Sequence, residues 1–368
     1  MNLSRKPHKL RLIFKQEFDM STMQEFENYL GNIDDLFDHH FGEKANTKDK
    51  EYIHPKLKNL GAVSLVVVRE VIAPFVVRNF EEGITDIELG KNHELHVRAV
   101  PNKFKYPERG RGLQLLRLLN CGGTMPQNKT QPRSKTQKPA EFYDLNTLVF
   151  GDSSVQDGRI LSVKAGVNYS DALSVLPKEL CVGETAHISA MESGTLYDDE
   201  RQESSVNLFN RHFVLPGTLL VQVLSTRGRV MPRIGLGHLL LCLGVAGTYG
   251  GQTSITGTNI RTHLAGLYGD AFEQAQTSPY ELLKTLPTEP QVLTQDVGVL
   301  SQYLHGQLSP VHQLNMDATA ITAYQHQLLD RFEQDFNGLK KDYQHAKGKL
   351  DEFFNGWFIK PEKKKKAS

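Results

Sequence analysis

Residues 63–79, VSLVVVREVIAPFVVRN, constrain the fold of this chain more than any other segment. The segment is rich in β-branched residues and too apolar for a surface loop, so it predicts a long buried strand that is bent or bulged at Pro74. It ends on two polar residues, Arg78 and Asn79. The chain is therefore expected to be built around a buried sheet.

Further regular elements are predicted downstream of this strand. Residues 110–120 place leucines at helical spacing, and Gly122 and Gly123 predict the end of that helix. Residues 159–167 and 211–228 are typical of strands, whereas residues 232–247 predict a largely buried helix. In this order the elements predict an α+β fold of the ferredoxin-like type that carries insertions.

The C-terminal part of the chain, residues 318–358, has a helical pattern. Its apolar residues recur mostly at i+3 and i+4 steps, which is typical of a stripe that packs against a core. The stripe consists of Tyr324, Leu328, Phe332, Phe336, Leu339, Tyr343 and Leu350.

Composition excludes several classes of protein. The 368 residues are 39% hydrophobic and 23% charged, as in ordinary globular proteins, and the length fits two domains or one large decorated domain. The longest uncharged apolar stretch, residues 235–247, is too short for a membrane span, which needs about 20 residues. The N-terminal residues lack the apolar stretch of a secretory signal, so the chain is predicted to be cytoplasmic.

The three cysteines are predicted to be structural thiols. Cys121, Cys181 and Cys242 are far apart in the sequence, and none belongs to a CxxC pair. This spacing favours neither a disulfide framework nor a zinc site with thiolate ligands.

Charge is unevenly distributed along the chain. Residues 98–138 contain ten Lys or Arg and a single acid, Glu108, for a net charge of +9. Residues 182–205 carry six acids and one arginine, for a net charge of −5, and a lysine-rich tail closes the chain. The separated blocks indicate an electropositive track, although a solvated surface remains the alternative for each block.

A glycine-rich stretch, TYGGQTSITGTNIRTH, follows the predicted buried helix at residues 248–263. It contains three glycines, six Ser or Thr, one Asn, one Arg and one His, and no acid. Hydrogen-bond donors on a backbone that glycine lets approach closely suit a polyanion such as phosphate. An ordinary surface loop has a similar composition and stays an alternative.

Motifs for several enzyme classes are missing from the sequence. No GxxxxGK[ST], GxGxxG or GxSxG motif occurs in a suitable context, so no nucleotide cofactor is predicted. Residues 34–40, DDLFDHH, contain metal-ligand types but follow no predicted strand, so no metal site is predicted. The base-stacking octapeptide of RNA-recognition domains is also missing, so an RNA-binding protein of this sequence would hold the RNA backbone rather than read its bases.

Four segments together carry a family resemblance. They are NTLVFGDSS at 146–154, SGTLYDDE at 193–200, NRHFVLPGTLLVQVLS at 210–225 and GGQTSITGTNIRTH at 250–263. In this order they resemble the large backbone subunit of type I-D CRISPR interference complexes, which belongs to the RAMP superfamily. The resemblance covers roughly residues 60–272.

The resemblance implies a modified RNA-recognition-type palm with an inserted lid and a thumb-like β-arm. The boundaries expected here are an N-terminal extension (1–60), a palm (61–275), a basic loop (122–140), an acidic arm (183–206), a C-terminal helical region (276–358) and a basic tail (359–368). Because the arm is acidic, it is expected to wedge between bases rather than to neutralise phosphate.

The resemblance also implies a function and partners. Copies of such a subunit stack along a guide RNA, grip its backbone and leave its bases free for target DNA. The expected partners are therefore CRISPR RNA, target DNA, further copies of the chain and the other subunits of the complex, with no membrane and no cofactor.

Candidate RNA-binding residues come from the resemblance, the basic block and the glycine-rich stretch. The resemblance implies that residues 250–254 hold guide phosphates and that Arg78 and Asn79 add a contact. The full candidate set is Arg78, Asn79, Lys103, Lys105, Arg109, Arg111, Arg117, Arg133, Lys135, Gly250, Gly251, Gln252, Thr253, Ser254, Thr256, Asn259, Arg261 and His263.

Two enzymatic alternatives stay open. Related backbone subunits of type III complexes cut target RNA with an aspartate in the loop after the first strand, and the matching segment here contains Glu81, Glu82 and Asp86. A metal-dependent nuclease would use these acids, although solvated turn acids explain them as well. The second alternative is an enzyme that binds a small phosphate ligand in the glycine-rich stretch. No catalytic residue is assigned with the leading interpretation.

Overall fold

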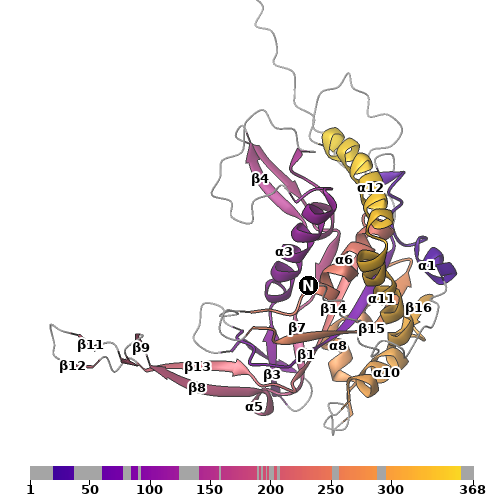
Figure 1. The fold of residues 1–368 in the computed structure, drawn as a ribbon. Coiled ribbons are helices and arrows are strands. Elements are labelled where there is room, and N and C mark those ends of the chain that lie inside the picture. Colours follow the sequence, from indigo (N-terminus) through magenta and orange to yellow (C-terminus); the bar gives the residue numbers. More distant parts are fainter. Residues whose placement is uncertain are drawn as a thin grey trace, which may run out of the picture.

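The computed structural model describes residues 20–36, 60–77, 84–89, 93–123, 141–156, 159–188, 190–191, 194–195, 197–198, 203–204, 208–250, 257–287 and 296–357. Structural statements below concern these residues. An antiparallel sheet runs through the centre of the molecule, with helices on both faces and a long two-stranded arm that projects from it (Figure 1). The predicted α+β class is confirmed.

The sheet has the strand order β16-β15-β1-β14-β7-β3-β2, and β6 pairs with β14. The strands are β1 (Ala62–Val71), β2 (Asp86–Leu89), β3 (Glu94–Ala99), β6 (Val167–Tyr169), β7 (Ala172–Pro177), β14 (Leu219–Thr226), β15 (Ile260–Asp270) and β16 (Leu314–Asp317). Helix α3 (Asn102–Leu119) follows β3, and helix α6 (Arg233–Val245) lies between β14 and β15 in the chain. Without its insertions, the chain runs β1-α3-β7-β14-α6-β15 with the spatial order β15-β1-β14-β7, which is the ferredoxin-like arrangement.

The first strand is central and buried, as predicted, but shorter than the sequence pattern suggests. β1 pairs with β14 on one side and β15 on the other, and its register with β15 shifts between Val66 and Val67. The strand ends at Val71, and beyond Pro74 an isolated bridge joins Phe75 to Val214. Because proline has no N–H to donate, the ladder cannot continue through it.

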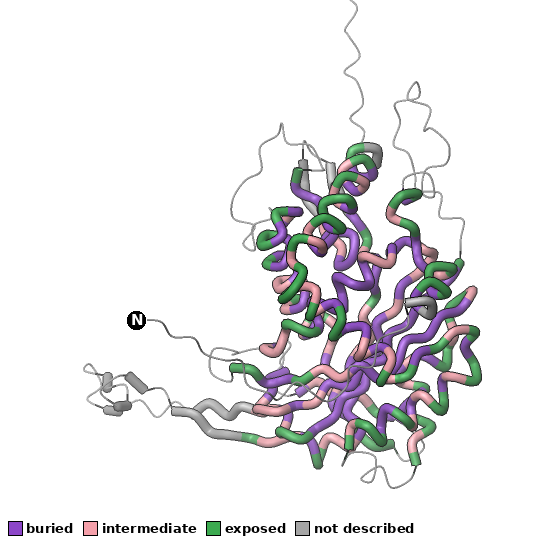
Figure 2. The backbone as a smooth tube through the Cα atoms, turned by 45° about the vertical axis from the view of Figure 1, so that its right-hand side comes forward, coloured by how far each residue is buried: buried purple, intermediate pink, exposed green. Residues whose placement is uncertain are grey.

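One face of the sheet is covered by α3, α6 and α4 (Leu145–Phe150). Alternate residues of β1, such as Val63, Leu65 and Val67, pack there against leucines of α3 and α6. The predicted helix at residues 232–247 is confirmed as α6, whose leucines are buried. The buried interior and exposed outer helix faces are distinguished by colour in Figure 2.

Helix α3 differs from its prediction at both ends. It begins at Asn102 rather than near Gly110, because burial of Phe104 outweighs the helix-breaking tendency of Pro107. Its C-terminal cap is Asn120, which adopts the left-handed conformation at φ 55°, so the prediction of a glycine cap at Gly122 and Gly123 was wrong. Asparagine is the commonest substitute for glycine at this position.

The opposite face is covered by α8 (Pro279–Lys284) and α10 (Val297–Leu308), with a 3-10 turn, η2 (Ala275–Thr277), before them. The C-terminal region is not purely helical, because β16 adds an edge strand to the main sheet. α11 (Ala318–Gln334) and α12 (Phe336–Trp357) confirm the predicted helical pattern. Most of the predicted stripe, including Tyr324, Leu339 and Tyr343, is buried in the core.

The described part of the N-terminal extension is packed rather than separate. α1 (Met20–Phe26) and the turn after it place Met23, Phe26, Leu30 and Leu36 in the same core as α6 and α12. Residues 60 and 61, the predicted boundary, therefore do not mark the edge of the packed unit.

The predicted thumb-like arm is a two-stranded antiparallel ladder. After the short helix α5 (Lys178–Cys181), β8 (Val182–Ile188) pairs with β13 (Leu208–Val214), and short strands β9 (Ala190–Met191), β10 (Gly194–Thr195), β11 (Tyr197–Asp198) and β12 (Glu203–Ser204) follow at its tip. A further hairpin, β4 (Asp152–Gln156) and β5 (Arg159–Val163), stands beside α3 (Figure 1). Most of the basic loop, residues 124–140, lies outside the described residues.

Two further expectations concern membranes and thiols. Among the described residues, no helix combines the length and the apolar character that a membrane span needs. Cys121, Cys181 and Cys242 are buried free thiols, as predicted.

A buried histidine in α6 gives the fold a specific pH dependence. His238 lies between the hydroxyl of Tyr343 (3.1 Å) and the amide oxygen of Asn146 (3.2 Å), and burial lowers its pKa from 6.5 to about 3. The folded protein keeps this histidine neutral, whereas the unfolded chain protonates it below about pH 6.5. The contribution of neutral His238 to the free energy of unfolding is therefore fully present above about pH 6.5. It is lost progressively as the pH falls towards 3.

We predict that His238→Gln removes this dependence. Between about pH 6 and pH 4, the free energy of unfolding of the unmodified protein should fall by about 1.4 kcal/mol per pH unit more than that of the variant. Denaturant titrations of both proteins across this range measure the difference. The Asp and Glu residues are the same in both proteins, so their contribution to the pH dependence cancels in the comparison. Parallel pH profiles would contradict the assignment.

Candidate nucleic-acid interface

A cavity of about 650 Å³ opens between the first half of α3, the end of α4 and the start of the glycine-rich stretch. Three cations predicted from the basic block, Lys103, Lys105 and Arg109, line it together with Gly250. The other lining residues are Val100, Asn102, Tyr106, Pro107 and Phe150. No described acid lines the cavity. The structure therefore brings together two segments that the sequence singled out separately.

The only acid of the basic block does not weaken the positive charge of this surface. Glu108 is fully buried and forms an ion pair with the equally buried Arg69 of β1, with a separation of 2.7 Å. Helix α3 thus directs this carboxylate into the core, whereas Lys103, Lys105 and Arg109 of the same helix line the cavity. Glu108 therefore does not offset the charge of the lysines that line the cavity.

The cavity also perturbs its lysines. Burial lowers the pKa of Lys103, and burial followed by repulsion from Arg109 lowers the pKa of Lys105. Among the described residues, Lys105 forms no ion pair, whereas Arg109 lies 2.8 Å from the carboxylate of Asp152. A phosphate group in the cavity would bring negative charge next to both lysines and would raise their pKa values.

Gly250 is the described end of the glycine-rich segment and needs to be glycine. Its φ is +80°, and a Cβ would lie 2.6 Å from the carbonyl oxygen of Val76 and 2.7 Å from the ring of Phe75. Two chain segments therefore meet here, one that continues to Arg78 and Asn79 and one that continues to Gly251. Arg78, Asn79, Gly251, Gln252, Thr253, Ser254 and Thr256 themselves lie outside the described residues.

Asn259 closes the base of the glycine-rich loop instead of pointing to solvent. Its side-chain oxygen accepts from the backbone N–H of Tyr249 (2.9 Å), and its side-chain nitrogen donates to the carbonyl of Tyr249 (2.9 Å). The residue is fully buried. The structure thus gives Asn259 a structural role, and as an RNA contact it has no exposed atom to offer.

Arg261 and His263 do not belong to the loop, because residues 260–270 form β15. Both side chains contact the carboxylate of Glu70, at 3.1 Å for Arg261 and 2.7 Å for His263. The intervening Thr262 points the other way and accepts a hydrogen bond from Arg69. Since neighbouring strand residues face opposite sides, Arg261 and His263 lie on the face of the sheet away from α3. Their grouping with the loop was wrong.

The remaining candidates lie away from the cavity or outside the described chain. Arg111 donates to Gln114 on the same helix, and Arg117 donates to the carbonyl of Gly123 (2.6 Å). Neither residue lines the cavity. Arg133 and Lys135 lie outside the described residues. An RNA contact of these residues stays a prediction.

Of the three acids considered for a nuclease, only Asp86 is described. It begins strand β2 instead of lying in a loop, and its carboxylate forms an ion pair with Lys178 at the base of the arm. Within the described part of the chain, no group of three metal-ligand side chains comes together. Glu81 and Glu82 lie outside the described residues.

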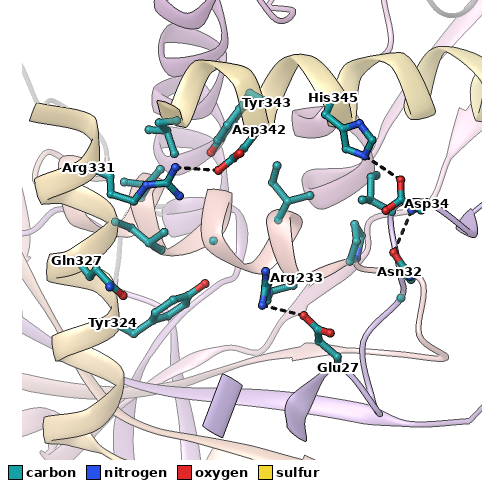
Figure 3. Close-up of a pocket in the computed structure, with 18 residues that line it drawn as sticks. Glu27, Asn32, Asp34, Arg233, Tyr324, Gln327, Arg331, Asp342, Tyr343 and His345 are labelled. Atoms are coloured by element: carbon teal, nitrogen blue, oxygen red, sulfur yellow. Dashed lines mark hydrogen bonds and ion pairs between the residues drawn. The ribbon is translucent and has the colours of Figure 1, made fainter. Parts of the chain in front are cut away.

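A second cavity, of about 600 Å³, lies on the other side of α6, against α11, α12 and the turn after α1 (Figure 3). Two ion pairs line it, Glu27–Arg233 (2.9 Å) and Arg331–Asp342 (2.9 Å), together with a hydrogen bond between Asp34 and His345 (2.8 Å). Both arginines of its lining are therefore paired with acids. This cavity lacks the excess positive charge of the first one and does not suit a polyanion.

The first cavity contains an aromatic residue, Tyr106, that is not among the candidates predicted from the sequence. Tyr106 lines it and is 68% exposed, which is unusual for so large a side chain. Its position between the cations Lys105 and Arg109 could have identified it. Aromatic residues interleaved with cations are typical of surfaces that bind single strands. The buried Glu108 offered no such signal, because burial cannot be read from an isolated acid in a basic block.

Comparisons with known proteins agree with this architecture. A family model described as "Csc2 Crispr" matches residues 82–346. No curated protein matches the chain. The chain is similar to the crystal structure of Thermofilum pendens Csc2, at 14% identity and a TM-score of 0.55, over 90% of this chain and 94% of that chain. At this identity the likeness shows a shared fold.

The chain is also similar to chains of two structures titled as a CRISPR RNA-guided surveillance complex, one of them pre-nicking. Both are 10% identical to it, with TM-scores of 0.43 and 0.38. They cover 67% and 66% of this chain and 87% and 81% of their own chains. The family model, in contrast, spans well over half of the sequence. This protein is thus a member of the Csc2 CRISPR family.

Proposed function

We propose that this protein binds CRISPR RNA as a backbone subunit of a type I-D interference complex. Family membership supports the general role of a backbone protein in a CRISPR surveillance complex. Copies of the chain would polymerise along the guide, hold its phosphates and leave its bases free to pair with target DNA. The other subunits of the complex are its further partners.

The observation that carries the proposal is the basic cavity beside Gly250. Lys103, Lys105 and Arg109 supply positive charge there, and Gly250 leads into a backbone that can approach a phosphate closely. The cavity holds no described acid that would repel a polyanion. Contacts of this kind position a nucleic acid without reading its sequence, as a subunit that accepts any guide requires.

The arm suits the same role. Its two strands extend from the palm, and its sequence carries a net charge of −5 over residues 182–205. An acidic arm repels phosphate, so its contribution to a guide–target duplex would be steric separation of bases.

Polymerisation on RNA gives the most direct test. We expect the mass of the complex, measured by native mass spectrometry with unstructured RNAs of increasing length, to grow in steps of one protein chain. RNAs of equal length and shuffled sequence should give the same number of bound chains, because phosphate contacts carry no base information. A complex that holds a single chain at every length, or binding that depends on one sequence, would contradict the proposal.

A further inference from the structure

The carboxylate of Glu108 accepts hydrogen bonds from three donors: the buried Arg69 and Tyr249 and the half-buried Tyr169. Its Oε1 atom accepts from a guanidinium nitrogen of Arg69 (2.7 Å) and from the hydroxyl of Tyr249 (3.0 Å), and its Oε2 atom accepts from the hydroxyl of Tyr169. These donors come from β1, from the residue next to Gly250, and from β6. One side chain of α3 is thus fixed to three other parts of the fold.

The guanidinium of Arg69 is itself held rigidly. It donates to Gln222 of β14 (2.9 and 3.1 Å) and to Thr262 of β15 (2.8 Å), and it lies 4.8 Å from the ring centre of Phe104. Arg69 and Glu108 are both fully buried. The central strands therefore determine where the carboxylate of Glu108 lies.

Glu108 links two of the segments that line the basic cavity, α3 and the chain that leads to Gly250. Lys105 and Arg109 flank it on α3, and Tyr249, which donates to it, directly precedes Gly250. Burial, and then the charge of Glu108, raise the pKa of Tyr249, so its hydroxyl stays protonated and can donate. A buried ion pair adds little to net stability compared with apolar packing, but it can select one arrangement of its surroundings.

We propose that Glu108 is a positioning residue of the RNA site, which holds Gly250, the described end of the glycine-rich stretch, against α3 through the hydroxyl of Tyr249. The inference depends on the proposed function, because Lys105 and Gly250 both line the cavity that is proposed to bind RNA. Glu108 would set the distance between these two residues. Correct spacing lets a single phosphate contact both of them. Without the hydroxyl, Tyr249 would keep its hydrogen bonds to Asn259 but lose its link to α3, so the backbone at Gly250 would be held less firmly against the cations.

The two tyrosines provide a matched pair of variants. Tyr249→Phe and Tyr169→Phe each remove one hydroxyl that donates to the same carboxylate, and each keeps the aromatic ring and the pair of Glu108 with Arg69. Tyr249 leads into the cavity wall, whereas Tyr169 lies in β6, opposite Leu224 of β14. Only the first variant should disturb the RNA site.

We expect Tyr249→Phe to weaken binding of unstructured RNA by about threefold to tenfold, the effect of one lost hydrogen bond, and Tyr169→Phe to leave it within about twofold. The slope of log affinity against log salt should stay unchanged in both variants, because no cation is lost. Hydrogen exchange without RNA should be faster at residues 247–250 and 257–260 in Tyr249→Phe alone.

Two results would overturn the inference while the unmodified protein binds RNA. One is equal RNA affinity of the two variants, and the other is equal hydrogen exchange at the loop base in both. Failure of the unmodified protein to bind RNA would overturn the proposed function instead, so the two failures are distinguishable.

Discussion

Replacing Glu108 with alanine should lower the free energy of unfolding by about 3–5 kcal/mol, the cost of leaving a buried charge without its partner. Arg69 would stay in the core beside Gln222 and Thr262, which are neutral and cannot balance its charge. The hydroxyls of Tyr169 and Tyr249 would lose their acceptor at the same time. Chemical denaturation at neutral pH measures the change.

An exposed ion pair serves as the control. Asp342→Ala breaks the pair with Arg331 across α11 and α12, where both side chains are well exposed, and should change the free energy of unfolding by less than about 1 kcal/mol. The double replacement Arg69→Met with Glu108→Leu should be less destabilising than Glu108→Ala alone, because it removes the orphaned charge. Equal losses for Glu108→Ala and Asp342→Ala would contradict the role given to the buried pair.

The second large effect is expected on RNA affinity. Reversing two cavity charges with Lys103→Glu and Lys105→Glu should weaken binding of single-stranded RNA by roughly 100-fold at about 0.1 M salt. Loss of the two contacts alone accounts for about 25-fold, since each contributes roughly 0.7 to the slope of log affinity against log salt, and repulsion adds the rest. Salt titrations should show a slope that is shallower by about 1.4.

A matched variant separates local contacts from overall charge. Lys340→Glu with Lys341→Glu makes the same change in net charge on α12, away from the cavity. We expect this variant to retain affinity within about threefold and to keep its salt slope, because neither lysine lines the cavity and interactions between separated charges are largely screened at this salt concentration. Equal losses in the two double variants would show that the cavity is not the contact site.

The order of elements was only partly predictable from sequence. The strand expected at residues 159–167 is divided between β5 of the side hairpin and the short β6, the core strand β7 was missed, and the strand expected at 211–228 is two strands, β13 and β14. The β-branched run before Pro74 and the leucine-rich run of α6 identified the two central elements of the palm. The start of α3 was not predictable, because Pro107 and Gly110 argue against a helix, and only packing of Phe104 and Glu108 in the core overrides them.

The candidate site was predictable in residue type but not in geometry. The sequence identified Lys105 and Gly250 as parts of separate features, and it could not show that they line one cavity. It could not separate Asn259 and Arg261 from the loop either, because composition does not reveal where a strand begins. Residue alternation along β15 then decides which side each residue faces.

The place where the arm joins the palm determines how freely the arm can change. Its strands β8 and β13 leave and rejoin the palm between β7 and β14, which are neighbours in the sheet, and the N–H of Leu215 donates to the carbonyl of Cys181 at the junction (2.8 Å). The two ends of the inserted segment are therefore already close together in the palm. Hairpins of other lengths and sequences can be exchanged at this junction without altering the strand pairing beneath them, which makes the arm a module that evolution or engineering can replace as a unit.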